Sequence, residues 1–187
     1  MKKISKILAA NRSEIAIRIF RAAEESGIKT AAIYSKEDRF AIHRFKTDES
    51  YLVGEGKGPI QAYLDIDSII KIAKDAQVDA IHPGYGFLSE SPELAEQCEK
   101  NDITFIGPSK EILKRFGNKT EAKKVAEEAK VGTVPSALVT KENLKSVEKE
   151  VEKIGYPVIV KASWGGGGRG MRIVRSSNEL IDQITTA

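Results

Sequence analysis

Short apolar runs alternate with amphipathic stretches through the first 110 residues of the chain. The helical stretches include one that Ser13 would cap and Gly27 would end, one after Asp67, and one from Pro92 to Lys100. Five runs have the length and composition of buried strands, at residues 6–10, 30–34, 51–53, 79–82 and 103–106. Strands that alternate with helices predict a doubly wound, Rossmann-like parallel sheet whose ligand edge lies at the carboxyl ends of the strands.

The pattern changes near residues 108–116, where a more charged sequence begins. We therefore predict one domain over residues 1–112 and a second over 113–187. The second is predicted to contain a charged helix at 119–130, a strand at 134–139, a helix at 141–154, strands at 157–162 and 171–175, and a final helix from about residue 177. This order is typical of an α+β unit. Because the pattern stops at Ala187, we expect that unit to be incomplete.

Composition excludes several classes of protein. Hydrophobic residues make up 41% of the 187 residues and charged residues 30%, which is ordinary for a globular protein. The formal net charge is only +3, so we expect no dedicated nucleic-acid interface. Cys98 is the single cysteine and is predicted to be a small buried helical residue. No apolar run is long enough for a membrane span or a signal sequence, and we expect a cytoplasmic protein without membrane partners.

The stretch from Val158 to Arg172 carries the strongest chemical signal. Its glycines match the spacing G-x-G-x-x-G, but Met171 and the residues after it alternate at the strand period, whereas a dinucleotide fingerprint opens a helix. Walker A spacing also fails, because no Lys-Ser or Lys-Thr follows Gly170. A glycine loop between two strands can instead fold backbone N–H groups over phosphates. The candidate anion-binding residues are Lys161, Gly165, Gly166, Gly167, Gly168, Arg169 and Gly170.

Two further segments fall at the expected ligand edge of the parallel sheet. Residues 80–90 run from a strand end into a turn of small residues, and a purely structural turn with His82 bonded to the backbone is an equally open interpretation. Residues 11–14 occupy the first strand-to-helix turn and contain no glycine, which argues against a dinucleotide there. Glu14 is expected simply to complete the first turn of the helix.

Together these segments resemble the biotin carboxylase component of biotin-dependent carboxylases. The resemblance covers essentially the whole chain and rests on residues 7–16, 80–90, 105–108, 117–119 and 161–172, which follow the family's order. Within that family, residues 43–51 and Trp164 look more like the bacterial pyruvate carboxylases than like the stand-alone subunit of acetyl-CoA carboxylase. The resemblance implies a pre-ATP-grasp domain followed by the first, incomplete part of an ATP-grasp domain.

The resemblance also implies a reaction, in which ATP and bicarbonate, with Mg²⁺, form carboxyphosphate that supplies CO₂ to biotin on a carrier domain. Lys119 and Lys161 would contact ATP phosphates, and the glycine loop would cover the β and γ phosphates. Tyr85 and Gly86 would border the biotin pocket. The implied partners are the biotin carboxyl carrier domain, the remainder of the carboxylase and, in the full-length family, further copies of the enzyme.

In this family the magnesium ligands, the adenine contacts and the bicarbonate-binding residues lie beyond position 187. We therefore expect no catalytic residue and no metal ligand in these 187 residues, and no activity from them alone. Glu179 and Asp182 share a helix face but are more typical of a solvated surface. Two alternatives stay open: a truncated, non-catalytic remnant that acts as an interaction module, and another ATP-grasp ligase, which the motif at 82–90 disfavours.

Overall fold

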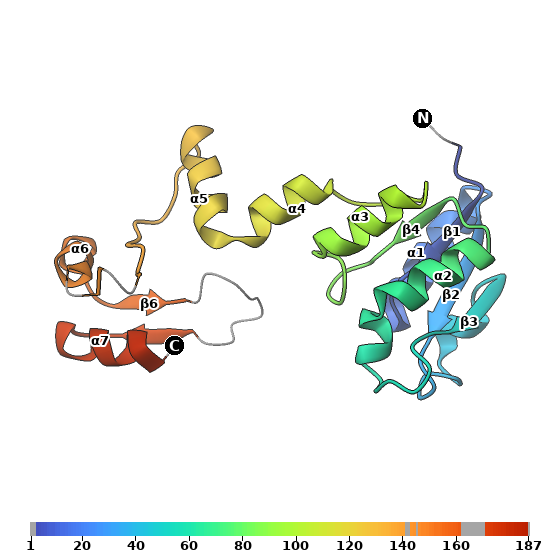
Figure 1. Ribbon diagram of the computed structural model, residues 1–187, viewed down its shortest axis with the longest axis horizontal. Helices are drawn as coiled ribbons and strands as arrows, with labels where there is room; N and C mark the ends of the chain where they lie inside the picture. The colour runs from blue at the N-terminus through green and yellow to red at the C-terminus, as the bar shows by residue number, and fades with distance from the viewer. Residues whose placement is uncertain (1–2, 141–142, 145, 162–170, 187) are drawn as a thin grey trace. The chain divides into compact units, whose positions relative to one another are not determined.

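The computed structural model describes residues 3–140, 143–144, 146–161 and 171–186. The chain divides into two compact units, Met1–Lys114 and Arg115–Ala187, which are described separately (Figure 1). The first unit contains the predicted doubly wound sheet. Its five strands are all parallel and lie in the order β3-β2-β1-β4-β5, which confirms the predicted fold class. The strands are β1 (Lys6–Ala9), β2 (Lys29–Tyr34), β3 (Glu49–Leu52), β4 (Ala80–His82) and β5 (Thr104–Phe105).

Helices cover both faces of this sheet. Successive residues of a strand point to opposite sides, and these strands have apolar residues on both sides that must be buried. Ile7 and Ala9 face α1 (Ser13–Glu25), which contributes Ile19 and Phe20 to that core. Leu8 lies in the core on the other face, which contains buried residues of two further helices. These are α2 (Ile66–Asp75) and α3 (Pro92–Lys100), and the 3₁₀ helices of this unit are η1 (Ile42–Phe45) and η2 (Gln61–Leu64). Cys98 is buried in α3, as predicted, and burial raises the pKa of its thiol to about 12.

The start of α1 differs from the sequence-based expectation. Arg12 occupies the N-cap position, and no side chain caps the helix. Ser13 is the first helical residue and has a left-handed φ of +56°, so the prediction that it caps α1 was wrong. The preceding Asn11 instead accepts a hydrogen bond from the Arg12 N–H at 2.9 Å through its side-chain oxygen. This turn is therefore shaped by contacts other than helix capping.

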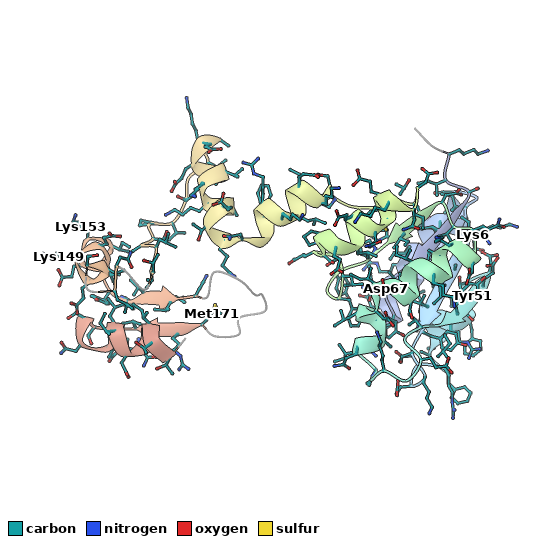
Figure 2. The ribbon with its side chains drawn as sticks, in the orientation of Figure 1. Lys6, Tyr51, Asp67, Lys149, Lys153 and Met171 are labelled. Atoms are coloured by element: carbon teal, nitrogen blue, oxygen red, sulfur yellow. The ribbon has the colours of Figure 1, made fainter. Side chains whose placement is uncertain are left out.

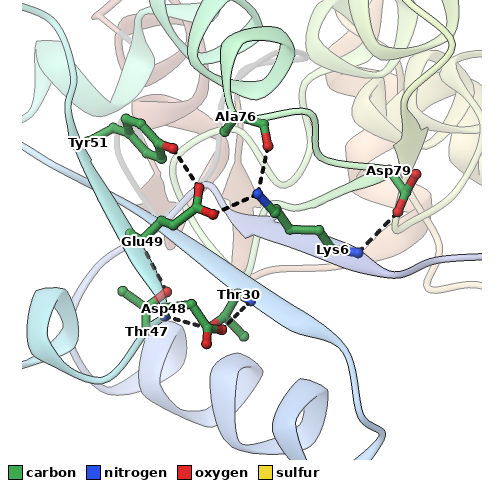
Figure 3. A network of polar contacts seen from close by, with 8 residues as sticks. All are labelled: Lys6, Thr30, Thr47, Asp48, Glu49, Tyr51, Ala76 and Asp79. Carbon is green, nitrogen blue, oxygen red and sulfur yellow. Dashed lines mark hydrogen bonds and ion pairs between the residues drawn. The ribbon is translucent and has the colours of Figure 1, made fainter.

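Polar contacts tie together the amino ends of the strands (Figure 3). Lys6, the first residue of β1, places its Nζ 2.7 Å from the Glu49 carboxylate on β3 and 2.9 Å from the carbonyl oxygen of Ala76. Glu49 also accepts a 2.6 Å hydrogen bond from the Tyr51 hydroxyl. Asp79, just before β4, accepts the Lys6 backbone N–H at 3.0 Å. With the amino edge held in this way, the carboxyl edge is the one open to loops that carry chemistry.

The second unit packs helices on an antiparallel hairpin. Its helices are α5 (Lys119–Glu128), α6 (Val147–Ile154) and α7 (Ser177–Thr186), α4 (Lys110–Gly117) crosses the division between the units, and the strands are β6 (Val158–Val160) and β7 (Arg172–Val174). The buried core consists of Val147, Val151, Val174 and Leu180. Lys149 and Lys153 lie on α6 (Figure 2). This α+β arrangement agrees with the predicted class of the second unit.

One predicted strand is absent. Residues 131–140 form neither helix nor strand, although a strand was expected at 134–139. Pro135 has no backbone N–H to give to a ladder, and Val134 is 82% exposed. Ala137 and Val139 pack against the core of this unit, but no strand among the described residues pairs with the segment. The helix predicted at 141–154 begins only at Val147.

Candidate functional site

The carboxyl edge of the five-stranded sheet brings together three loops. Asn11 and Arg12 follow β1, Asp38 follows β2, and residues 83–88 follow β4. Asp38 accepts hydrogen bonds from Arg12 Nη1 at 3.0 Å and from the Tyr63 hydroxyl at 2.8 Å. Burial alone would raise the pKa of Asp38, but these donors outweigh it and hold the pKa below the ordinary value. The loops at this edge are therefore joined by a partly buried ion pair.

Asn11 holds the loop after β4 by its backbone. Its amide Nδ2 donates to the carbonyl oxygens of Pro83 at 2.7 Å and Tyr85 at 2.9 Å, and the residue is only 3% exposed. Gly84 passes directly over this amide with a φ of +68°, and a Cβ there would lie 2.7 Å from Asn11 Nδ2. Only glycine meets both conditions, the left-handed backbone and the close approach.

His82 takes part in the same turn. Its Nδ1 accepts the Gly84 N–H at 3.0 Å, so the interpretation of His82 as a backbone-bonded turn residue is confirmed. Burial lowers the pKa of His82 and favours the neutral imidazole that can accept this bond. The sequence alone does not determine this role of His82, because the role depends on how the turn folds back on itself.

Tyr85 and Gly86 present the open side of this loop. The Tyr85 side chain is 60% exposed, and its hydroxyl donates a short hydrogen bond to Glu14 Oε1. That hydrogen bond raises the pKa of Tyr85 above its ordinary value. Gly86 has a φ of +66°, and nothing lies within 4 Å of the place where its Cβ would stand. Glu14 therefore does more than complete the first turn of α1, because it also holds Tyr85.

Lys119 and Lys161 both lie in the second unit. Lys119 is the first residue of α5, exposed, directly after the N-cap Asn118, whose side-chain oxygen accepts the backbone N–H groups of Thr120 and Glu121 at 2.9 and 3.2 Å. Lys161 is exposed and directly follows β6. The remaining candidates, from Gly165 to Gly170 together with Arg169, lie outside the described residues, as does Trp164.

The hairpin exposes an apolar face that the sequence argument overlooked. Val158, Val160 and Val174 pack into the core, whereas Ile159 and Ile173 are opposite each other in the ladder and are 53% and 56% exposed. Met171 lies just before β7 (Figure 2), and its side chain is 50% exposed. By strand alternation, Met171 and Lys161 fall on the same face as the two isoleucines. The alternation was readable in the sequence, but which face stays open depends on where α6 and α7 pack.

No group of three or more possible metal ligands occurs among the residues that the structure describes. Glu179, one of the two acids considered above, accepts the Arg175 backbone N–H at 3.2 Å near the start of α7. Its carboxylate therefore has a structural partner. The described part of the chain also contains no helix with the length and apolarity needed to cross a membrane.

Two features together are typical of one class of protein. The carboxyl edge of a parallel sheet carries the loop at 83–88, and a later hairpin strand is followed by a lysine and then by a run of glycines in the sequence. The family described as "Biotin carboxylase, N-terminal domain" matches residues 3–113, and the chain belongs to this family. The family described as "Carbamoyl-phosphate synthase L chain, ATP binding domain" matches residues 118–187. The resemblance drawn from the sequence is thereby confirmed.

Several pyruvate carboxylases and a biotin carboxylase domain are similar to this chain. Pyruvate carboxylase of Bacillus subtilis is 58% identical over 186 residues, which span 100% of this chain and 16% of that protein. A structure of Rhizobium etli pyruvate carboxylase has a TM-score of 0.87 and 55% identity, covering 96% of this chain and 16% of the other. The biotin carboxylase domain of Hydrogenobacter thermophilus 2-oxoglutarate carboxylase, in complex with MgADP, ADP and bicarbonate, has a TM-score of 0.90 and 42% identity, covering 97% of this chain and 40% of the other. The chain thus spans about one sixth of the curated relatives it matches.

Proposed function

We propose that this chain forms the amino-terminal part of the biotin carboxylase region of a pyruvate carboxylase. The region would use ATP and bicarbonate to carboxylate biotin on a carrier domain, within an oligomeric enzyme. Residues 1–112 would be the pre-ATP-grasp domain and 113–187 the first part of the ATP-grasp domain. The family matches at 3–113 and 118–187 and the identity to pyruvate carboxylases along the whole chain support this assignment.

The observation that carries the proposal is the open face of the β6–β7 hairpin. Ile159, Met171 and Ile173 give it an apolar surface, and Lys161 lies at the end of β6, before the glycine run. A nucleotide needs this combination, since its base is flat and apolar and its phosphates are anionic. We therefore assign the hairpin face to ATP, with the base on the isoleucines and methionine and the phosphates toward Lys161. On this assignment, one adenine contact surface would lie within these 187 residues, where we expected none from the sequence.

The chemical work of these residues is electrostatic and positional. Bicarbonate oxygen attacks the γ phosphorus and ADP leaves, so negative charge on the phosphoryl oxygens must be held in place. Lys161, Lys119 and the backbone N–H groups of residues 165–170 would supply that charge stabilisation. Mg²⁺ would neutralise phosphate charge when bound, and the residues that the structure describes contain no cluster of side chains to hold it. Tyr85 and Gly86 would border the acceptor, biotin.

A chimeric enzyme tests the proposal. This chain replaces the segment of Bacillus subtilis pyruvate carboxylase that it matches. The chimera is produced without biotinylation, so that added free biotin is the only acceptor. We expect ATP cleavage that depends on bicarbonate and is stimulated by biotin. A well-folded chimera with neither property would refute the function.

The 187-residue chain alone supplies the matched control. It spans only 40% of the biotin carboxylase domain that it resembles, so we expect it not to carboxylate free biotin. Carboxylation by this short chain above background would contradict the proposal that it forms only one part of the biotin carboxylase region. If the chimera is inactive while unmodified Bacillus subtilis pyruvate carboxylase is active, the alternative of a non-catalytic interaction module is favoured.

A further inference from the structure

The residues after β1 form a clasp on the loop that carries Tyr85. Asn11 holds two carbonyl oxygens of the loop, and Glu14 holds the Tyr85 hydroxyl. Between them, the Arg12 guanidinium carbon lies 5.5 Å from the ring centroid of Tyr63 and 5.6 Å from that of Phe87. The turn where a dinucleotide-binding domain would carry glycines is thus occupied by three side chains directed to a single loop. Of these three side chains, only Arg12 carries a positive charge.

The surroundings of Arg12 fix the position of its charge. Asp38 Oδ2 lies 3.0 Å from Arg12 Nη1, and the same oxygen accepts from the Tyr63 hydroxyl at 2.8 Å. Tyr63 is fully buried, and its hydroxyl also accepts the Ser35 N–H at 3.2 Å. A guanidinium held by a carboxylate on one side can present its flat face to aromatic rings. The ion pair therefore orients Arg12 toward Phe87.

Phe87 needs such a restraint. Its φ is +38°, in the left-handed region that residues other than glycine, asparagine and aspartate rarely adopt. Its ring is stacked on Tyr63, with centroids 5.2 Å apart and planes 10° from parallel. A backbone in this region persists only where neighbouring contacts hold it. Arg12 and Tyr63 supply these contacts two residues from Tyr85.

We propose that Arg12 is a positioning residue for the biotin acceptor: it sets the conformation of the loop at 84–88 through Phe87 and so places Tyr85 and Gly86. This inference rests on the proposed function for its readout. It assigns Arg12 no contact with ATP or with biotin. The loss expected from its removal is therefore specific to the acceptor side of the reaction.

The experiment uses the unbiotinylated chimera described above with the substitution Arg12→Met, which keeps an unbranched apolar side chain and removes the cation. We expect the KM for free biotin to rise about tenfold, a typical cost for a desolvated cation–π contact and its ion pair. Bicarbonate-dependent ATP cleavage without biotin should stay within about twofold of the parent. Arg12→Lys keeps the charge but not the planar fork, and it should recover part of the lost affinity.

Arg39→Met is the matched control. Arg39 also lies over an aromatic ring, Phe40, at 4.8 Å, but it is exposed and has no hydrogen bond, ion pair or ring contact with the described residues of the loop at 84–88. Its substitution should leave the KM for biotin unchanged. If Arg12→Met lowers both activities equally with an unchanged KM, its role is general stability and the inference is wrong.

A second measurement does not depend on catalysis. In the 187-residue chain, the Gly84 amide donates to His82 and the Ser89 amide donates to the carbonyl oxygen of Gly86 at 2.9 Å. Arg12→Met should speed hydrogen exchange of these two amides about tenfold relative to Arg39→Met. Equal exchange in the two variants would overturn the inference. An inactive parent chimera would refute the proposed function but leave this second test decisive.

Discussion

The two units of this chain bury their sheets in different ways. In the first unit, helices cover both faces of the parallel sheet, and Leu8, Ile33 and Ile81 are completely buried. In the second, the hairpin buries only the face toward α6 and α7, while Ile159 and Ile173 stay more than half exposed. A sheet covered on both sides has no apolar surface left to offer, so ligands meet it at the ends of its strands. A hairpin covered on one side leaves its other face open to a ligand.

This difference separates the two halves of the proposed reaction. The proposed acceptor side is the loop at 83–88, which hydrogen bonds and the Arg12 ion pair hold at the sheet edge. The proposed nucleotide side is an apolar face with a cation at its end, where binding would follow from exposed surface and charge. Substitutions in the buried sheet of the first unit should therefore act on stability, and substitutions on the exposed hairpin face should act on nucleotide binding.

The largest effect is expected for Lys161→Ala in the chimera. Loss of a cation that stabilises charge on transferring phosphoryl oxygens typically lowers turnover by ~10²–10³-fold. Stability should hardly change, because Lys161 is exposed. The control is Lys153→Ala, an exposed lysine of α6 (Figure 2), which should leave turnover within about twofold. Similar ATP cleavage in both variants would remove the assignment of the hairpin face to ATP.

The next prediction compares two isoleucines, one in each unit. Ile81→Ala removes a fully buried side chain from the middle of the sheet and should lower the free energy of unfolding by about 2–5 kcal/mol. Ile173→Ala truncates a side chain that is 56% exposed and should cost less than about 0.5 kcal/mol. Urea denaturation followed by circular dichroism measures both. Equal costs would mean that the exposed hairpin face is covered in solution.

Hydrogen exchange compares the units without any substitution. Amides of β1, β2 and β4 lie inside a parallel ladder with packed helices on both sides, whereas β6 and β7 form only a two-stranded pair. We expect exchange in the hairpin to be at least about tenfold faster, because isolated two-stranded ribbons are marginal without a second covered face. Equal protection in the two units would contradict the comparison.

The parallel sheet could be predicted from the sequence because its signals are local. Runs such as residues 6–10 and 30–34 are apolar, short and flanked by helical periodicity, and all five predicted strands are present. Lys161 was singled out for the same reason, since a lysine in an apolar strand before glycines is unusual. Its role at the nucleotide stays a prediction until it is tested.

The features that sequence reasoning missed depend on tertiary contacts. Arg12 meets Asp38, Tyr63 and Phe87, which lie 26, 51 and 75 residues further along the chain, so no local pattern connects them. The strand expected at 134–139 failed for the opposite reason. Its local composition is apolar, but no strand in the described part of the chain supplies hydrogen bonds to it.

The smallest expected effect concerns acid. In the described residues, all the carboxyl groups with a lowered pKa, including Asp38, Asp48 and Asp65, lie in the first unit. For Asp48, the hydrogen bonds from the Thr30 hydroxyl and N–H, each 2.7 Å long, lower the pKa. A lowered folded-state pKa adds stability above the unfolded value of about 3.9, and this stability is lost as the pH falls through the folded value. Acid should therefore weaken the first unit preferentially.

Asp48→Asn isolates this contribution. At pH 7 the variant should unfold with a free energy about 0.5–1 kcal/mol lower than the parent, a modest value because Asp48 is exposed and solvent screens its charge. The difference should begin to shrink below about pH 4 and vanish as the pH falls through the lowered pKa of Asp48 in the folded protein, where the parent's carboxylate becomes protonated. Asp67→Asn, the same change at an exposed position of α2 (Figure 2), is the control and should show a smaller difference. A difference between Asp48→Asn and the parent that is as large at pH 3 as at pH 7 would show that charge is not what Thr30 stabilises at Asp48.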